Sequence, residues 1–356
     1  MKPLAGVRII EFDGLGPVTL AGMVLADMGA EVLRLTRADG ASAFGDVGGA
    51  VLHRGRSAVP VDLKSPADRA DVLDLIARAD AVIEGFRPGV MERLGLGPDV
   101  CAAANPLLVF GRVTGWGQTG PLAETVGHDI NYIALTGALH AMGEPDRPPR
   151  PPLNLVGDYG GGAMLLVTGL LAAIIEARQT RRGRVVDAAM TDGVSLLSSL
   201  FHALSASGLW SAERGSNLLD GGAPFYRCYA CADGRFVAVG ALEPRFYAAL
   251  LQGLGIDPGE APQFPPSGWP ALHARFGDVF ATRSRDDWAA HFDGTEACVT
   301  PVLTFAEAAS HPHNVSRSTL VGEPVQPSPA PRFDDTVTAP QPGTALDLSS
   351  AVERWT

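Results

Sequence analysis

The sequence predicts an α/β protein in which a mostly parallel sheet, covered by helices, is followed by a second and smaller α/β unit. Two patterns predict this class. Strand-like and helix-like segments alternate through the first third of the chain, which is typical of βαβ units. After residue 226 the pattern changes to a hairpin followed by helices. With 46% hydrophobic and 19% charged residues, the 356-residue chain has the composition of a well-packed globule.

The alternation begins with the buried-strand pattern of Val7–Phe12 and the helical spacing of Val18–Gly29. The strand-like segment Glu31–Thr36 follows directly. Ser65 and Pro66 then predict a helix start, because serine caps helices and proline suits the first turn. The other strand-like segments of this part are 57–62, 81–85, 107–113 and the first half of 184–193.

The predicted domain organisation follows from where this rhythm stops. The assigned ranges are 1–190 for a large domain, 191–226 for a linker, 227–312 for a small α/β domain and 313–356 for a second linker. The small domain opens with a hairpin whose turn is Asp233-Gly234. The proline-rich stretch EPVQPSPAPRF, residues 323–333, is predicted to be extended rather than part of a core.

Charge and targeting signals exclude several classes of protein. A net charge of −11 argues against a general nucleic-acid binder and requires any anionic ligand to be met by local Lys or Arg. The N-terminal residues run straight into a strand-like segment, so we expect no signal peptide. The apolar run Gly160–Ile175 is interrupted by glycine and is expected to be a buried helix rather than a membrane span.

The four cysteines, Cys101, Cys228, Cys231 and Cys298, suit a reducing cytoplasm. Cys228 and Cys231 form a C-x-x-C pair. A structural zinc site needs two further ligands at suitable spacing, and none follows nearby in the sequence. We therefore expect neither a metal nor a redox role for this pair.

Several residues at the ends of predicted strands are candidates for binding phosphate. Gly14-Leu15-Gly16 hints at a dinucleotide fingerprint, although its third glycine is out of register. Arg34 and Arg37 at the end of the second strand suit a phosphate on an adenosine ribose, but surface arginines on a tight turn explain them equally well. Arg87 lies between a strand and a proline-started helix, which is a natural diphosphate site.

Three acidic residues and one histidine are candidates for chemistry. Asp129 and Asp158 can both be explained as helix caps, and Glu243 as an acid at a helix start. His128 precedes Asp129 in a glycine-flanked turn, where loops often present functional groups. Three glycines follow Asp158 and cost a helix roughly 1 kcal/mol each against alanine. Bare backbone N–H groups that approach a ligand or a developing oxyanion would offset this cost.

These stretches together resemble the α-methylacyl-CoA racemases of the family III CoA-transferase superfamily. The motifs that carry the resemblance are GHDINY, PLNLVGDYGGGAM, RPGVMERLGLGP, RVTGWGQTGP, LDGGAPFY and ADGRFVAVGALEPRFY. They cover nearly the whole chain, from residue 3 to about residue 333. The resemblance implies a Rossmann-like large domain, a small domain and a return of residues near 330–356 to the large domain. It also implies an interlocked homodimer whose active sites are shared between chains.

The resemblance also assigns roles to residues. His128 and Asp158 match the two bases of the family, Asp129 supports the site, and Glu243 would come from the partner chain. The residues expected to bind the CoA part of an acyl-CoA thioester are Leu15, Arg37, Val61, Leu63, Gly85, Phe86 and Arg87. Met164 and Met190 are candidates for an apolar surface that carries the acyl chain, with core packing as the alternative.

The implied chemistry needs no metal and no redox cofactor. One base removes the proton α to the thioester and the other returns a proton on the opposite face. Imidazole and carboxyl groups have reference pKa values of about 6.5 and 3.9, so the enolate itself must be stabilised. Backbone N–H donors after Asp158 are the expected source. We expect a cytoplasmic enzyme of branched fatty acid or sterol side-chain metabolism, without a nucleic-acid or membrane partner.

Two other functions fit part of the pattern. A family III CoA-transferase would use Asp158 as a nucleophile that forms a mixed anhydride, but this reading leaves His128 unexplained. A non-catalytic acyl-CoA-binding protein would keep Arg37 and Arg87 and need neither base. The GHDINY stretch therefore favours the racemase.

Overall fold

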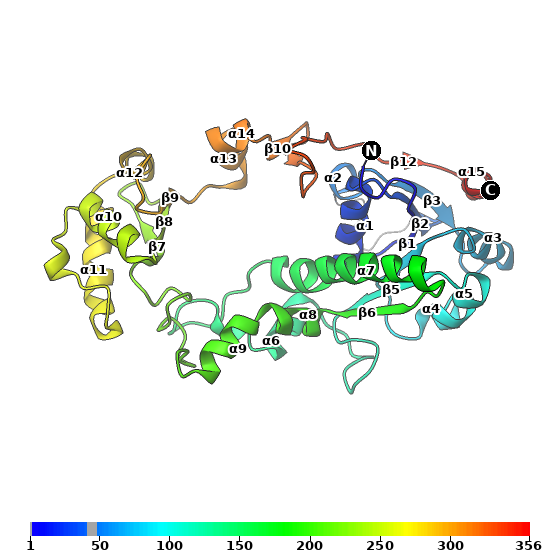
Figure 1. The fold of residues 1–356 in the computed structure, drawn as a ribbon, viewed down its shortest axis with the longest axis horizontal. Coiled ribbons are helices and arrows are strands. Elements are labelled where there is room, and N and C mark those ends of the chain that lie inside the picture. The colour runs from blue at the N-terminus through cyan, green and yellow to red at the C-terminus, as the bar shows by residue number, and fades with distance from the viewer. Residues whose placement is uncertain (1, 41–47) are drawn as a thin grey trace. The chain divides into compact units, whose positions relative to one another are not determined.

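The computed structural model of the chain describes residues 2–40 and 48–356 (Figure 1). The chain divides into two compact units, each described here by itself. The first unit comprises Met1–Ala138, Pro152–Ser199 and Pro312–Thr356. The second unit comprises Leu139–Pro151 and Leu200–His311.

The first unit is built on a parallel sheet. Among the described residues, seven strands pair in the order β12-β3-β2-β1-β4-β5-β6, and every neighbouring pair is parallel. The strands are β1 (Arg8–Phe12), β2 (Glu31–Arg37), β3 (Ser57–Val61), β4 (Ala81–Glu84), β5 (Val109–Thr114), β6 (Val185–Ala189) and β12 (Thr344–Ala345). The predicted parallel sheet is confirmed. Its strand order reverses between β1 and β4, where open α/β sheets bind ligands at the carboxyl ends of their strands.

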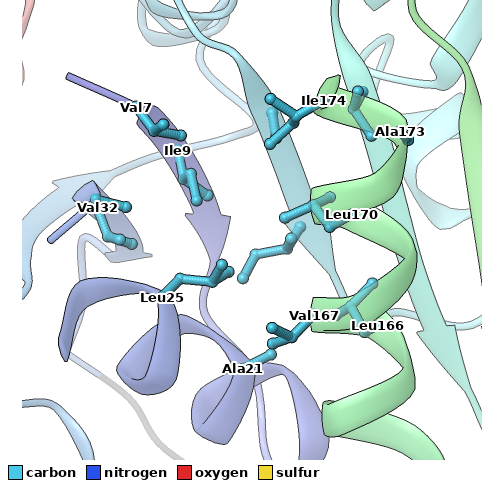
Figure 2. Packing of buried hydrophobic residues seen from close by; sticks show 14 of the residues in the cluster. Val7, Ile9, Ala21, Leu25, Val32, Leu166, Val167, Leu170, Ala173 and Ile174 are labelled. Atoms are coloured by element: carbon cyan, nitrogen blue, oxygen red, sulfur yellow. The ribbon is translucent and has the colours of Figure 1, made fainter. Parts of the chain in front are cut away.

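Helices cover both faces of this sheet because alternate strand residues point to opposite sides. Ile9 packs with α1 (Pro17–Asp27) and α7 (Met164–Thr180) in one core, which also contains Leu25 and Leu170 (Figure 2). Ile10 lies in the core on the other face. The helices on that face are α3 (Pro66–Ile76), α4 (Val90–Arg93), α5 (Pro98–Ala104) and α15 (Leu348–Trp355). Ser65 caps α3 as predicted, accepting the Asp68 N–H.

The segment around Asp158 departs from the expected structure. Leu155–Ala163 forms a π-helix, η2, that continues directly into α7. Together they make Leu155–Thr180, the one stretch of the described chain that is long and apolar enough to cross a membrane. Half of its most apolar window is buried, so it serves as a core helix of the first unit. The helix is longer than the apolar run Gly160–Ile175 indicated.

Two further helices pack against η2. They are α6 (Asp129–Leu135) and α8 (Met190–Leu197). Glycines allow the close approach of α8, because a Cβ on Gly193 would lie 2.0 Å from the Gly161 carbonyl oxygen. The remaining short helix of this unit's N-terminal part is α2 (Gly49–Leu52).

The second unit contains an antiparallel sheet of three described strands, in the order β7-β8-β9. The strands are β7 (Tyr226–Ala230), β8 (Phe236–Gly240) and β9 (Val299–Pro301). The predicted hairpin is confirmed, and Gly234 takes the left-handed backbone conformation in its turn (φ 74°). The helices of this part are α9 (Ser199–Ala206), α10 (Pro244–Leu254), α11 (Trp269–Phe280), α12 (Arg285–Phe292) and α13 (Phe305–Ser310). Aromatic side chains such as Phe276 and Trp288 fill its core.

The unit boundaries differ from the sequence-based ranges in three places, one of which is that residues 200–226, assigned to the linker, group with the second unit. Residues 139–151 were assigned to the large domain but group with the second unit. Residues 191–199 were assigned to the linker but belong to the first unit, because α8 packs on η2.

The last part of the chain belongs to the first unit. After α14 (Pro312–Ser316) and the hairpin β10 (Leu320–Val321) and β11 (Gln326–Pro327), β12 pairs with β3. Arg54 donates a hydrogen bond to the Pro327 carbonyl (2.6 Å), so the proline-rich stretch is held against this unit. Arg8 donates to the carbonyl of Trp355, the buried end of α15 (3.0 Å).

Candidate active site

The carboxyl edge of the sheet gathers the predicted CoA-binding residues. Leu15 follows β1, Arg37 and Val61 end β2 and β3, and Leu63 follows shortly after. Gly85, Phe86 and Arg87 follow β4 directly. Because β1 and β4 lie on either side of the point where the strand order reverses, these residues occupy the position where doubly wound sheets bind nucleotides.

The two arginines considered on β2 have different surroundings. The Arg34 guanidinium is nearly buried and donates to Asp13 Oδ1 (2.9 Å), so it is held within the protein. Arg37 is 70% exposed and pairs with Asp39 (2.7 Å) on the surface. Of the two, only Arg37 is accessible to an anionic ligand.

The loop that carries Arg87 is fixed by a buried carboxylate. Glu84 ends β4, is fully buried, and accepts the Phe86 N–H (2.6 Å) through Oε2. Its other oxygen accepts from Arg112 Nε on β5 (2.7 Å). Phe86 also packs edge-to-face against Phe12 at 6.3 Å. Arg87 itself is exposed and forms no ion pair with another described residue.

The opening of α6 corrects one prediction. The N-cap of this helix is His128, whose backbone is extended, and Asp129 is the first helical residue rather than the cap. The His128 N–H donates to Asn131 Oδ1 (3.0 Å). The side chain of His128 is exposed, whereas that of Asp129 is buried.

The carboxylate of Asp129 connects α6 with η2. Its Oδ1 accepts the backbone N–H of Asp158 (2.7 Å). Gly157 makes room for this contact, since a Cβ there would lie 2.2 Å from Asp129 Oδ1. The second oxygen, Oδ2, is buried without a hydrogen-bond partner among the described residues. His128 and Asp158 are therefore brought to the same place on the first unit.

Asp158 lies within the π-helix, so its interpretation as a helix cap is wrong. Asn154, one turn earlier, donates to its Oδ2 (3.2 Å). The pKa of the Asp158 carboxyl is raised, mainly by its burial and to a smaller extent by the negative charge of Asp129. The hydrogen bond from Asn154 and the charge of His128 lower this pKa but do not cancel the rise. A Cβ on Gly16, the N-cap of α1, would lie 3.0 Å from Asp158 Oδ2, so the carboxyl lies beside that helix start.

The glycines after Asp158 do not serve the predicted purpose. A π-helix bonds each N–H to the carbonyl five residues earlier, so the N–H groups of Gly160–Gly162 are used within the helix. These glycines instead allow close packing, because a Cβ on Gly161 would lie 2.7 Å from Val194 on α8. Free N–H donors are found instead in the first turns of α6 and α1, where a helix has no internal acceptor for them.

The elements that carry His128 and Asp158, together with α8, also carry exposed apolar side chains. Met190 is buried, which agrees with its interpretation as a core residue, whereas Met164 is 43% exposed. The elements α6, η2 and α8 pack together. Their exposed apolar residues, with the start of α7, are Ile130, Leu135, Leu155, Met164, Leu196 and Leu197.

The remaining candidates lie in the second unit. Glu243 is exposed and is the N-cap of α10, where it makes no side-chain capping hydrogen bond. Cys228 lies on β7 and Cys231 follows it, and both are free thiols. No group of three or more potential metal ligands occurs among the residues that the structure describes.

Sequence reasoning missed three residues of the site. Asn154 contacts Asp158, and Tyr132 and Trp116 hold the loop before His128. Asn154 and Tyr132 each lie four residues from a predicted base, a spacing that places two side chains on one helical face. That spacing is the signal that could have identified them.

Comparisons with known proteins show the family of the chain. The sequence pattern of CoA-transferase family III matches residues 4–343. The alpha-methylacyl-CoA racemase of Mus musculus is 45% identical over 95% of this chain and 88% of its own length. The Homo sapiens alpha-methylacyl-CoA racemase is 42% identical over the same shares. A crystal structure of a CAIB/BAIF family protein from Brucella suis shares the fold, with a TM-score of 0.82, 24% identity and coverage of 99% of this chain and 98% of that chain. The chain belongs to CoA-transferase family III.

Proposed function

We propose that the protein is an α-methylacyl-CoA racemase that interconverts the 2R and 2S forms of 2-methylacyl-CoA thioesters. One observation carries the proposal. The buried Asp129 carboxylate follows His128 and accepts the Asp158 N–H (2.7 Å), so an imidazole and a carboxyl are held together on one unit. The 42–45% identity to two racemases over 95% of the chain supports the same activity.

The reaction moves one proton off C2 and another onto it. One base, His128 or Asp158, takes the α-proton, and the electron pair of the C–H bond moves to the thioester oxygen. The other base, which must then be protonated, delivers its proton to the opposite face of the enolate. The raised pKa of Asp158 favours the protonated form that one direction of the reaction requires.

The enolate oxygen needs hydrogen-bond donors close to both bases. The first-turn N–H groups of α6 directly follow His128, and those of α1 lie beside the Asp158 carboxyl. Donors aimed at a developing oxyanion typically contribute several kcal/mol. We infer that one of these helix starts binds the thioester oxygen, in place of the glycine N–H groups predicted from sequence.

The CoA part binds along the carboxyl edge of the sheet in this proposal. Arg37 and Arg87 contact phosphates, while Leu15, Val61, Leu63, Gly85 and Phe86 line the nucleotide path. The exposed apolar side chains of α6, η2 and α8 carry the acyl chain. Such an open apolar surface discriminates weakly between chain lengths, which suits branched fatty or sterol side-chain thioesters.

We also infer an interlocked homodimer with shared active sites, in which the partner chain supplies a Glu243 that hydrogen-bonds near the histidine. The reaction transfers protons only, so we propose that it needs no metal and no redox cofactor. Dialysis against a strong chelator should then leave the rate unchanged. Four free cysteines suit a cytoplasmic enzyme, which cell fractionation would test.

A family III CoA-transferase remains the competing function, because an Asp158 carboxyl beside a helix start also suits a nucleophile. A single enantiomer of a 2-methylacyl-CoA ester, incubated without any acceptor acid, separates the two. Loss of optical purity that His128→Ala abolishes supports the racemase. The racemase proposal would be overturned if the optical purity stayed constant and the addition of a carboxylic acid led only to transfer of CoA to that acid.

A further inference from the structure

Two aromatic side chains hold the loop that precedes His128. Trp116, just after β5, donates a hydrogen bond from Nε1 to the Thr125 carbonyl (3.1 Å). Tyr132, one turn along α6 from His128, donates its hydroxyl proton to the Gly127 carbonyl. The carbonyl groups three residues and one residue before His128 are therefore both tied to the body of the unit.

The two rings fix one another. They meet edge to face, with centroids 4.8 Å apart and planes at 90°. Two glycines leave the space that the Tyr132 ring occupies, because a Cβ on Gly115 would lie 2.0 Å from the ring and a Cβ on Gly127 would lie 2.8 Å from it. Burial raises the pKa of Tyr132, and the charge of Asp158 adds to the rise, so the hydroxyl stays a donor at neutral pH.

This arrangement matters because the imidazole of His128 is exposed. An exposed side chain has little packing to hold it, so its position depends on the backbone that carries it. On its C-terminal side that backbone is the first turn of α6, where Asn131 accepts the His128 N–H (3.0 Å). On its N-terminal side only a loop leads to it, and Tyr132 and Trp116 bond to that loop.

We propose that Tyr132, assisted by Trp116, is a positioning residue for His128 and acts on the proton transfer at one face of the substrate only. The inference rests on the proposed racemase function. The Asp158 carboxyl is held by Asn154 at the start of η2, which belongs neither to α6 nor to the loop before His128. Loosening the loop before His128 should therefore displace one base and leave the other in place. A displacement of about 1 Å at a reacting group can cost on the order of 10²-fold in rate.

The test measures the proton exchange catalysed by each base separately. In D2O, a base that removes the α-proton can exchange it with solvent and return deuterium to the same face. Deuterium in the recovered starting enantiomer therefore reports the base on that face, without requiring the other. The enantiomer served by His128 is the one whose exchange His128→Ala abolishes, and Asp158→Asn identifies the other.

Tyr132→Phe removes only the hydroxyl and keeps the ring. We expect exchange of the enantiomer served by His128 to fall about tenfold or more, and exchange of the other to change less than about twofold. Trp116→Phe should act in the same direction. The matched control is Tyr229→Phe in the second unit. It also removes a hydroxyl that donates to a backbone carbonyl, that of Pro224 (2.6 Å), and should change neither rate.

Each outcome has one meaning. Equal losses on both faces in Tyr132→Phe would show a general structural role and overturn the inference, as would no loss on either face. Preserved exchange on the Asp158 face shows in the same sample that the variant has folded. If His128→Ala and Asp158→Asn each leave both exchanges intact, the proposed function fails instead, independently of Tyr132.

Discussion

At the scale of single residues, Asp129 connects the two proposed bases. It follows His128 in sequence, and its buried carboxylate accepts the Asp158 N–H (2.7 Å). A hydrogen bond to a charged group contributes about 1.5–3 kcal/mol, more than an average one. The neighbouring Gly157 has no side chain to obstruct it. The position of Asp158 relative to His128 therefore depends on the hydrogen bond from the Asp158 N–H to Asp129.

A stability measurement tests the buried carboxyl of Asp158. Because folding raises its pKa above the ordinary 3.8, the folded state binds more protons than the unfolded state between those two pKa values. The contribution of Asp158 to the free energy of unfolding therefore falls as pH rises through that window. Asp158→Asn removes the charge and should be more stable than the parent at pH 7. The gain should shrink as the pH falls through that window and should be lost below pH 3.8.

Urea unfolding at pH 7 and at acidic pH would measure this difference. The same variant should lose about 10²-fold or more in racemisation, since it lacks a proton-transferring group. Equal stability of variant and parent at pH 7 would contradict the inferred destabilisation by the ionised carboxyl.

The residues of the site were predictable to different degrees. His128 and Asp158 occur in motifs with unusual glycines, so the sequence drew attention to them. Asn154 and Tyr132 are marked only by their spacing of four residues from Asp158 and His128, because their roles depend on hydrogen bonds to Asp158 and to the Gly127 carbonyl. The interpretation of Asp129 as a cap was wrong for a related reason: its carboxylate caps the Asp158 N–H rather than its own helix.

At the scale of elements, the π-helix η2 determines where Asp158 lies. π-Helices are rare in proteins, but those that occur often lie at functional sites. This one packs on α8 through glycines on both sides, and no α-helical turn precedes it. A pattern of apolar residues distinguishes helix from strand but not a π turn from an α turn. The sequence therefore predicted an apolar helix here and missed its geometry.

Gly193→Ala tests the packing of α8 on η2. Its Cβ would lie 2.0 Å from a backbone oxygen of Gly161, which cannot move without shifting η2. We expect a loss of about 1–3 kcal/mol or more in the free energy of unfolding. The matched control is Gly277→Ala in α11, where a Cβ meets nothing within 4 Å. That variant should gain about 0.5–1 kcal/mol. Denaturant unfolding of both variants measures the contrast, and similar effects would refute it.

The contact between Glu84 at the end of β4 and Arg112 on β5 leads to a prediction about CoA affinity. Glu84→Gln retains the shape of the side chain but turns one of its two acceptors into a donor facing Phe86 or Arg112. We expect the loop that carries Arg87 to shift and free CoA to bind about tenfold more weakly by calorimetry. Glu92→Gln removes the other carboxylate bonded to Arg112 without touching Phe86, and should change CoA affinity much less. Equal affinities in both variants would remove the proposed role of this loop.

At the scale of the whole molecule, the chain crosses between its two units several times. Residues 139–151 lie in the second unit between two segments of the first, and 312–356 belong to the first again. A linear division of the sequence cannot detect such an excursion, because the segment has no strand or helix pattern of its own. The sheet was predictable because long buried strands have a clear pattern, whereas β12, with two residues, has none.

Sharing of active sites between chains can be tested by complementation. In the proposed dimer, a chain with Asp158→Ala and a chain with Glu243→Ala form one site with both residues intact and one with neither. Mixed dimers should recover about half of the parent activity, although each variant alone is nearly inactive. Co-expression with two different affinity tags isolates the mixed dimer. Mixed dimers as inactive as their parents would place Asp158 and Glu243 of one chain in the same site.

The central claim is that two different groups serve the two faces of C2. The most direct measurement starts from an unlabelled 2S thioester in D2O and determines deuterium in the 2R product at early times by mass spectrometry. Two bases predict a product that is almost wholly deuterated from the first turnovers, because the proton removed by one base is not the one delivered by the other. A product that retains the protium of its substrate would show a single base acting on both faces and would contradict the account.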